Sequence, residues 1–334
     1  MKRSAVLLPA LLLSLAACGQ TPAPGAGSAL TAQATGRWVS GTYTNAYGSR
    51  FYRLWVPGGY DGASARPLMV MLHGCGQDGY DFAAGTRMNA QADARNFLVL
   101  YPEQGTAYNA FDCWNWFYDV NQRRGSGEPS LIAGMIGWVG ANYRVDAARV
   151  AVAGLSAGAA MANVMGCTYP DQVRRVAAFA GVMYRAATTA TGGTDAMKNG
   201  SLYDPNGRGT DCFREMGSSR RTVPTLIFQG TADTTVNPKN ASQTVAQWAQ
   251  ANDLAHDGLD DGDVDATADA SATGTACRPY TRQDYRNSAT GAVVVQRYTI
   301  DGLGHAWSGG STAGSYSDAC GPDASAIIVG FFGF

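Results

Sequence analysis

Charged side chains are scarce in this chain: Asp, Glu, Lys and Arg make up 15% of its 334 residues, and the formal net charge is −1. A protein this close to neutrality does not attract nucleic acid or an anionic membrane surface through its overall charge. We therefore expect no nucleic-acid partner. Hydrophobic residues make up 46%, which is enough for one large domain with a substantial core or for two small ones.

Closely spaced cysteines are absent as well. None of the seven cysteines belongs to a C-x-x-C pair, so a structural zinc site is not expected, and no motif requires a metal ion or an organic cofactor. Six cysteines follow the N-terminal one, an even number that suits disulfide bonds in an oxidising compartment. The sequence alone leaves the pairing of these six open: Cys75, Cys113, Cys167, Cys212, Cys277 and Cys320.

The longest apolar run lies at the N-terminus, where AVLLPALLLSLAA follows two basic residues. It is typical of a signal peptide and is too short to span a bilayer as a mature anchor. Because the run ends in LAAC, which resembles a bacterial lipobox, we predict a signal peptide over residues 1–18 and a lipidated Cys18 that anchors the protein to a membrane. Cleavage after residues 32–34 is the alternative. In both cases we expect export to the cell envelope or beyond it, with residues 19–36 as a flexible tether.

Short apolar runs that suit buried strands alternate with helix-like segments along the rest of the chain. We therefore predict one α/β domain over residues 37–334, with a mostly parallel central sheet, an antiparallel start and helices on both faces. No internal repeat and no separate second domain is evident, and the sequence predicts no particular oligomeric state. The expected strands are 37–44, 50–57, 67–72, 97–102, 149–153, 175–181, 224–230, 280–287 and 292–300, and the expected helices are 80–95, 130–143, 157–167, 241–250 and 323–332.

Residues 252–276 are rich in Asp, Ala and Gly and contain no aromatic residue. We expect this segment to be an exposed acidic insertion. Five Asp residues between positions 257 and 265 raise the alternative of a calcium loop. The segment lacks the Asp or Asn at the third position and the Glu at the twelfth that an EF-hand loop requires, so the solvated loop is favoured.

The segment RVAVAGLSAGAAM places one hydroxyl, that of Ser156, between a short apolar strand and a helix-compatible run. A G-x-S-x-G motif in this context is typical of a nucleophile elbow, in which the serine adopts a strained backbone conformation. Glycines at positions 154 and 158 suit such an elbow because the strand and the helix pass close to each other. We predict that Ser156 is a nucleophile; a flexible turn after a strand is the alternative.

A serine nucleophile needs a base, and the chain has only three histidines. His256 lies in the acidic segment, and His73 precedes the serine, whereas in the hydrolase order the acid and then the base follow the nucleophile. His305, in the loop after the last expected strand, fits that order. Asp233, at the carboxyl end of an expected strand, is the predicted acid, and Asp301, four residues before the base, is the rival.

Backbone N–H groups near the serine are needed to bind the oxyanion that forms during acyl transfer. We expect one of them from Ala157, the residue after the nucleophile. The other is expected from Gly74-Cys75-Gly76, in the loop after the third strand. In this arrangement His73 shapes the loop through hydrogen bonds and does not transfer protons.

Six motifs of this chain carry a family resemblance: LHGCGQ, CWNWF, VAGLSAGAAM, FQGTADTTVNP, GLGHAWSGG and GPDAS. Together, and in this order, they resemble the poly(3-hydroxybutyrate) depolymerase-like esterases, which are α/β-hydrolases related to feruloyl and acetylxylan esterases. The similarity covers nearly all of the chain from about Gly41 onward. It is therefore more specific than the G-x-S-x-G motif alone.

The resemblance implies a serine ester hydrolase with the α/β-hydrolase fold, a triad of Ser156, Asp233 and His305, and an oxyanion hole formed by the amides of Cys75 and Ala157. It also implies a Cys75–Cys113 disulfide that pins the CWNWF loop beside the site. The expected substrate is a poly(3-hydroxybutyrate)-type polyester or its oligomers, and feruloyl or acetyl esters of plant polysaccharide are the alternative. The acidic segment and the other four cysteines do not map onto the family. A catalytically silent surface lipoprotein and a peptidase are the remaining alternatives.

Aromatic residues near the expected site have two interpretations. Most tryptophans are buried in protein cores. Trp307, two residues after the predicted base, and Trp114 and Trp116, in the CWNWF loop, are candidates for lining a substrate cleft instead.

Overall fold

The computed structural model describes residues 35–334. The predicted signal peptide, the lipidated Cys18 and nearly all of the predicted tether lie outside these residues. Within the described part, the main sheet has ten strands in the order β1-β2-β4-β3-β5-β6-β7-β10-β9-β8. The strands are β1 (Arg37–Asn45), β2 (Gly48–Val56), β3 (Arg66–Leu72), β4 (Leu98–Pro102), β5 (Val145–Leu155), β6 (Arg175–Phe179), β7 (Thr225–Gly230), β8 (Ala270–Ala276), β9 (Arg278–Arg286) and β10 (Val293–Ile300).

The middle of this sheet is parallel and both of its edges are antiparallel. Strands β4, β3, β5, β6, β7 and β10 pair in parallel. At one edge β1 pairs with β2 and β2 with β4 in antiparallel fashion, and at the other edge β9 joins β10 and β8 joins β9 in the same way. The predicted sheet with an antiparallel start is confirmed. A separate short pair, β11 (Trp307–Ser308) and β12 (Ser317–Asp318), is also parallel.

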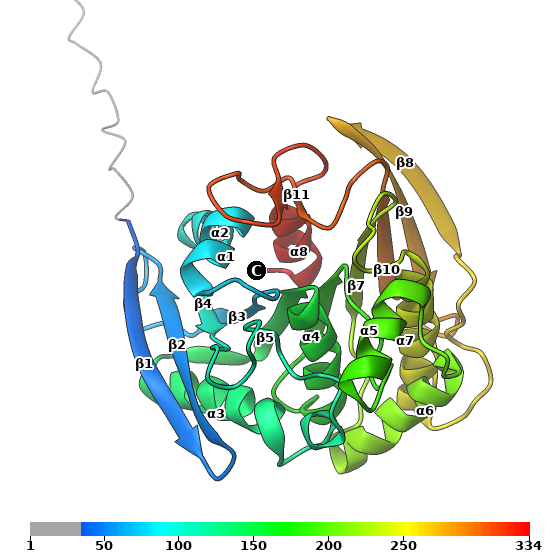
Figure 1. The fold of residues 1–334 in the computed structure, drawn as a ribbon, viewed down its shortest axis with the longest axis horizontal. Coiled ribbons are helices and arrows are strands. Elements are labelled where there is room, and N and C mark those ends of the chain that lie inside the picture. The colour runs from blue at the N-terminus through cyan, green and yellow to red at the C-terminus, as the bar shows by residue number, and fades with distance from the viewer. Residues whose placement is uncertain (1–34) are drawn as a thin grey trace, which may run out of the picture. The chain divides into compact units, whose positions relative to one another are not determined.

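Two buried cores lie on opposite faces of the sheet because successive strand residues point to opposite sides. On β3, Leu68, Val70 and Leu72 belong to one core, whereas Met69 and Met71 belong to the other. Helices cover both faces, as expected (Figure 1). The first core is covered by α3 (Gly127–Asn142), α4 (Ala157–Thr168), α5 (Ala190–Asn199), α6 (Pro205–Met216) and α7 (Lys239–Asp257), and the second by α1 (Gly79–Thr86), α2 (Met88–Arg95) and α8 (Ala324–Phe332).

The segment at 252–276 differs from the predicted exposed insertion at both of its ends. Helix α7 continues to Asp257, and Asp253 within it is buried, where its carboxylate accepts hydrogen bonds from the amides of Gly262 and Val264. The last seven residues form β8, an exposed edge strand of the main sheet. The density of acidic residues predicted a solvated loop, but Asp253 is buried and holds the following loop against α7.

Helices α5 and α6 were not expected from the sequence, because the region between β6 and β7 is rich in Gly and Thr. Each begins with a side-chain cap: Thr189 accepts from the amide of Gly192, and Asp204 accepts from the amide of Gly207. Such caps satisfy amide groups that have no partner within the helix. Both helices contribute buried residues to the first core, so tertiary packing stabilises them.

All six cysteines beyond Cys18 form disulfides in the structure. Cys75 pairs with Cys113, as the resemblance implied, and the other pairs are Cys167–Cys212 and Cys277–Cys320. Among residues 35–334, no helix has the length and hydrophobicity needed to cross a bilayer.

Candidate active site

The G-x-S-x-G motif forms a sharp turn between β5 and α4. Strand β5 ends at Leu155, α4 begins at Ala157, and Ser156 between them has φ 57° and ψ −119°. A non-glycine residue held in such a sparsely populated region costs about 1–3 kcal/mol, and such residues cluster at functional sites. The Ser156 amide donates to the carbonyl of Phe179 on the neighbouring strand at 2.9 Å, which helps to hold the turn.

Glycine is required on both sides of the serine because backbone segments meet there. A Cβ atom at Gly154 would collide with the carbonyl of Gly158, and a Cβ atom at Gly158 would collide with the carbonyl of Leu72 at the end of β3. The ends of two parallel strands and the start of α4 thus pack without intervening side chains. This close packing matches the expectation for a nucleophile elbow.

His305 and Asp233 form a hydrogen-bonded pair. Nδ1 of His305 lies 2.8 Å from Oδ2 of Asp233, whose side chain is fully buried. The other carboxylate oxygen accepts from the amides of Thr235 and Val236 at 2.9 Å each, and Gln229 donates its side-chain amide to Oδ2. The acid therefore has a fixed position and directs one ring nitrogen of the histidine.

Several contacts keep Asp233 ionised. Burial raises the pKa of its carboxyl, but the hydrogen bond and charge of His305 and the bonds from Val236 and Thr235 outweigh this effect, so the pKa lies below its ordinary value. An ionised carboxylate can only accept, so Nδ1 of His305 carries the proton. The lone pair of the neutral ring is then on Nε2, where a general base needs it.

Ser156 and His305 line the same cavity, which has a volume of about 200 Å³. The other residues of this histidine-side cavity are Gly74, Cys75, Leu155, Met197, Thr235 and Tyr316. His305 directs Nδ1 to Asp233, and a catalytic hydrogen bond between a serine hydroxyl and the other ring nitrogen often forms only when substrate is bound. The structure thus brings together residues that the sequence separates by 149 positions, the difference between 305 and 156.

The two predicted oxyanion donors also lie beside Ser156. Ala157 is the first residue of α4, where helix amides lack partners within the helix and favour negative charge. Cys75 lies in the loop after β3 and lines the histidine-side cavity. A Cβ atom at Gly74, the residue before it, would lie 3.5 Å from the Cβ atom of Ser156, so this loop passes directly beside the serine.

His73 differs from His305 in its contacts. It is fully buried, its Nδ1 lies 2.8 Å from the carbonyl of Gly74, and its Nε2 accepts from the amide of Gln104 at 3.0 Å. Burial lowers the pKa of His73, although the bond to Gly74 opposes this shift. Both ring nitrogens are used within the protein, so His73 shapes the loop that carries Cys75, as expected.

A buried polar network behind this loop was not predicted from the sequence. Gln104 also donates to the carbonyl of Cys113 and to the carboxylate of Glu128, and Arg50 donates to both Gln104 and Glu128. Glu128 in turn accepts from the backbone and side-chain amides of Asn115 at 2.8 Å each. Burial raises the pKa of Glu128, against the effect of these bonds and of Arg50.

Two of the three tryptophans predicted as cleft residues lie in the core and line no cavity beside Ser156. Trp307 is 1% exposed, packs between Phe82 and Phe179, and donates to Ser325. Trp114 is fully buried as well. Proximity in the sequence to the predicted base or to the disulfide did not reveal the direction of these side chains.

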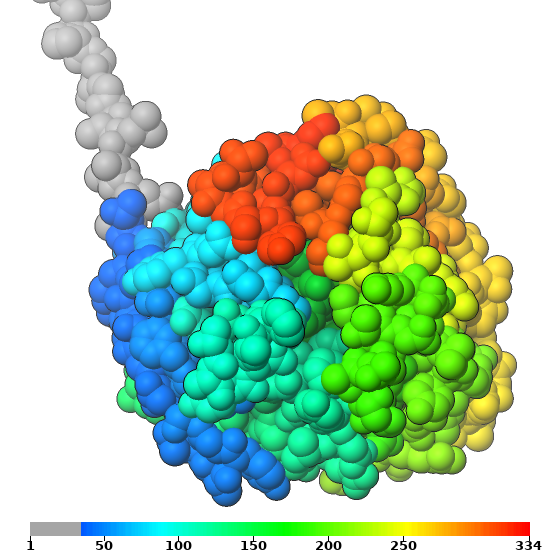
Figure 2. Space-filling model, viewed as in Figure 1, coloured from blue at the N-terminus to red at the C-terminus, as the bar shows by residue number. Residues whose placement is uncertain are grey.

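Trp116 is buried as well, but it lines a cavity next to Ser156. This aromatic cavity has a volume of about 350 Å³ and includes Ser156, Ala157 and Cys75. The molecular surface is hollowed where the loop at 109–118, α5 and the segment after His305 come together (Figure 2). The remaining lining residues, most of them not predicted, are Asn109, Phe111, Cys113, Asn115, Phe117, Tyr118, Ala190, Gly193, Thr194 and Met197.

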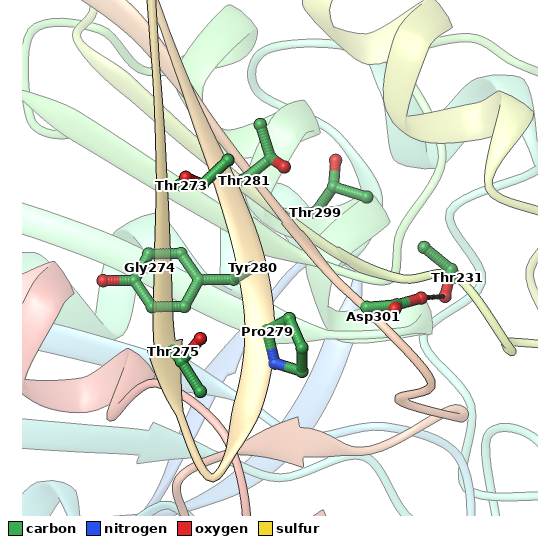
Figure 3. A pocket seen from close by; sticks show the side chains of 9 residues that line it. All are labelled: Thr231, Thr273, Gly274, Thr275, Pro279, Tyr280, Thr281, Thr299 and Asp301. Carbon is green, nitrogen blue, oxygen red and sulfur yellow. Dashed lines mark hydrogen bonds between the residues drawn. The ribbon is translucent and has the colours of Figure 1, made fainter.

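A third depression, of about 500 Å³, lies against β8, β9 and β10 (Figure 3). Thr273, Thr281 and Thr299 stand in register on these three strands, and Thr231 donates to Asp301 at its border. None of the predicted site residues lines it. Its size alone therefore does not make it the reaction site.

The described residues contain one group with ligand atoms close enough to hold a metal ion: His256, Asp257 and Asp263, within 4.8 Å of one another. His256 and Asp257 end α7, Asp263 lies in the loop after it, and none of the three lines either cavity beside Ser156. Exposed acidic groups often occur without a metal ion, and here His256 already contacts Asp263.

The parallel sheet, the strained serine at the end of β5 and the His–Asp pair in the loops after β7 and β10 define an α/β-hydrolase. The chain belongs to the esterase PHB depolymerase family, whose model matches residues 50–273. It is 34% identical over 240 residues to poly(3-hydroxyalkanoate) depolymerase C of Paucimonas lemoignei, covering 72% of this chain and 54% of that protein. It is 32% identical over 251 residues to feruloyl esterase B of Neurospora crassa, covering 73% of this chain and 80% of that protein.

Acetylxylan esterase A of Talaromyces purpureogenus is 29% identical over 224 residues, covering 63% of this chain and 56% of that protein. The chain thus spans about half the length of two of these three relatives. Among solved structures, an acetyl xylan esterase from Aspergillus awamori matches with a TM-score of 0.68 at 20% identity, covering 88% of this chain and 99% of that one. This structural likeness supports the fold.

The Asp233–His305 contact predicts the effect of one conservative substitution. In Asp233→Asn an amide replaces the carboxylate that accepts from Nδ1 of His305. The ring then no longer favours the tautomer with its proton on Nδ1 and its lone pair on Nε2. We expect kcat on p-nitrophenyl butyrate to fall by roughly 10³–10⁴-fold, with an unchanged circular dichroism spectrum. The matched control is Asp301→Asn, which changes the rival acid. If Asp301→Asn lost kcat by roughly 10³–10⁴-fold and Asp233→Asn lost little, the acid would be Asp301 and not Asp233.

Proposed function

We propose that this protein is an exported carboxylic-ester hydrolase that forms an acyl-enzyme on Ser156 and acts on poly(3-hydroxybutyrate)-type polyester or its oligomers. The observation that carries the proposal is the arrangement of the site: a strained serine and a histidine fixed by a buried carboxylate line one cavity. Family membership and the names of the relatives, a depolymerase and two kinds of esterase, support ester hydrolysis.

In the acylation step, Oγ of Ser156 attacks the carbonyl carbon of the ester while its proton passes to Nε2 of His305. Negative charge moves onto the carbonyl oxygen, where the N–H groups of Cys75 and Ala157 bind it. Loss of one such donor costs on the order of 3 kcal/mol of transition-state stabilisation. The bond to the alcohol oxygen then breaks, this oxygen takes the proton from His305, and the acyl group remains on Ser156.

Deacylation repeats these steps with water as the nucleophile. Water attacks the acyl carbon and gives one proton to His305, and the oxyanion again faces the amides of Cys75 and Ala157. When the intermediate collapses, Oγ of Ser156 leaves and recovers that proton. Asp233 stays ionised and stabilises the imidazolium in both halves of the reaction.

A feruloyl esterase is the second candidate function. The match to feruloyl esterase B favours this candidate, because it covers 80% of that protein's length. Both functions use the same mechanism and differ in the acyl group that occupies the site.

The nucleophile can be tested by covalent labelling. A fluorophosphonate probe is expected to modify the protein stoichiometrically at Ser156, and Ser156→Ala should abolish labelling. Ser271→Ala, an exposed serine on β8, is the matched control and should label fully. A folded wild type that remains unlabelled would instead support a catalytically silent binding protein, and cleavage of casein would support a peptidase.

The substrate class can be tested by comparing three substrates under the same conditions: hydroxybutyrate oligomers, methyl ferulate and acetylated xylan. We expect the highest kcat/KM on the oligomers. A value for methyl ferulate that exceeds it by orders of magnitude would replace the first candidate with the second.

Export and anchoring through Cys18 are also part of the proposal. Three disulfides suit an oxidising compartment. Cells expressing the full chain are expected to incorporate labelled palmitate into the protein, and Cys18→Ser should abolish this. Incorporation that survives the substitution would exclude Cys18 as the lipidated residue.

A further inference from the structure

Two cavities meet at the nucleophile. The histidine-side cavity and the aromatic cavity have Cys75, Ser156 and Met197 in common, and the other lining residues differ. An ester whose carbonyl carbon lies at Ser156 therefore places one half of the molecule in each cavity.

The position of His305 decides which half is which. The alcohol oxygen must receive its proton from this histidine, so the alcohol half has to lie on the side where the ring is. His305 lines the smaller cavity and is not among the residues of the aromatic one. The aromatic cavity instead contains Ala157 and Cys75, whose amides face the carbonyl oxygen in the proposed mechanism.

We propose that the aromatic cavity is the acyl site, that it takes an extended or aromatic acyl group much larger than acetyl, and that Thr194 on α5 sets the size limit. The inference rests on the proposed roles of Ser156 and His305. It favours hydroxyalkanoyl oligomers and aromatic acyl groups over acetyl esters as substrates.

The size and the lining of the cavity support a large acyl group. A volume of about 350 Å³ would remain mostly unfilled around an acetyl group. The rings of Trp116, Phe117 and Tyr118 form a continuous aromatic wall, with centroids 5.3 Å and 4.7 Å apart. Phe111 at the border is 76% exposed, so the cavity is open to solvent on this side and an acyl chain can extend through it.

Helix α5 forms another part of the cavity wall. Gly193 packs against Phe117, since a Cβ atom added to it would lie 3.1 Å from that side chain. Asn240 of α7 donates to the carbonyls of Ala196 and Met197 and thereby fixes the C-terminal half of α5. Thr194 lines the cavity but is otherwise exposed, so a larger side chain there fills the cavity without disturbing a core.

The test is Thr194→Trp, with Thr191→Trp as the matched control, because Thr191 is exposed on the same helix and lines none of the cavities described above. Substrates are p-nitrophenyl acetate and p-nitrophenyl hexanoate, which share the leaving group. The wild type is expected to prefer hexanoate. Thr194→Trp should lower kcat/KM for hexanoate by roughly tenfold or more and leave acetate within about twofold, whereas Thr191→Trp should change neither.

Three outcomes would overturn the inference. Equal losses on both esters, or no loss on either, would mean that the cavity does not select the acyl group. A loss that follows the alcohol, measured with ethyl and benzyl butyrate, would assign the cavity to the leaving group. In each of these cases a wild type that hydrolyses the esters keeps the proposed function intact, whereas a wild type that hydrolyses none of them would end the proposed function and this inference together.

Discussion

The close approach of three backbone segments beneath Ser156 is the constraint on which the site depends. The end of β3, the end of β5 and the start of α4 touch at Gly154 and Gly158, where no Cβ atom fits. The chain has to reverse direction between the strand and the helix within one residue, and that residue takes a positive φ. The same turn places Ser156 directly before the first residue of α4, so one feature positions both the proposed nucleophile and a proposed donor for the oxyanion.

Buried hydrogen bonds also fix the positions of loops near Ser156 that come from distant parts of the sequence. Gln104 contacts His73 in one loop and Cys113 in another, and Glu128 holds Asn115 in place. The disulfide between Cys75 and Cys113 joins the same two loops covalently. Glu128 is a buried charge paired with Arg50, and removing one member of such a pair is typically costly because the other is left uncompensated. The network therefore links the loop of Cys113 and Asn115, which lines the aromatic cavity, to the loop that carries Cys75.

Most of the sheet could be predicted from the sequence because its central strands are buried on both faces and read as continuous apolar runs. The order of serine, acid and base favoured His305 over His73, and of these two histidines only His305 lines a cavity with Ser156. Other parts lack such a local signal. Strand β8 consists of small residues at an exposed edge, α5 and α6 depend on packing, and the partners Arg50 and Glu128 are 78 positions apart. The Trp307 side chain points into the core because it packs against Phe82 and Phe179. No local sequence pattern predicts this packing. The catalytic roles of Ser156, Asp233 and His305 remain proposals that their geometry supports.

Helix α5 belongs to the segment between β6 and β7, and none of the triad candidates lies in it. It borders the aromatic cavity through exposed or half-buried side chains and is held by α7 from behind. Substitutions in its solvent-facing turn can therefore accumulate without touching the strained serine or the His–Asp pair. Under the proposed mechanism, a change in the accepted acyl group therefore requires no change at Ser156, Asp233 or His305.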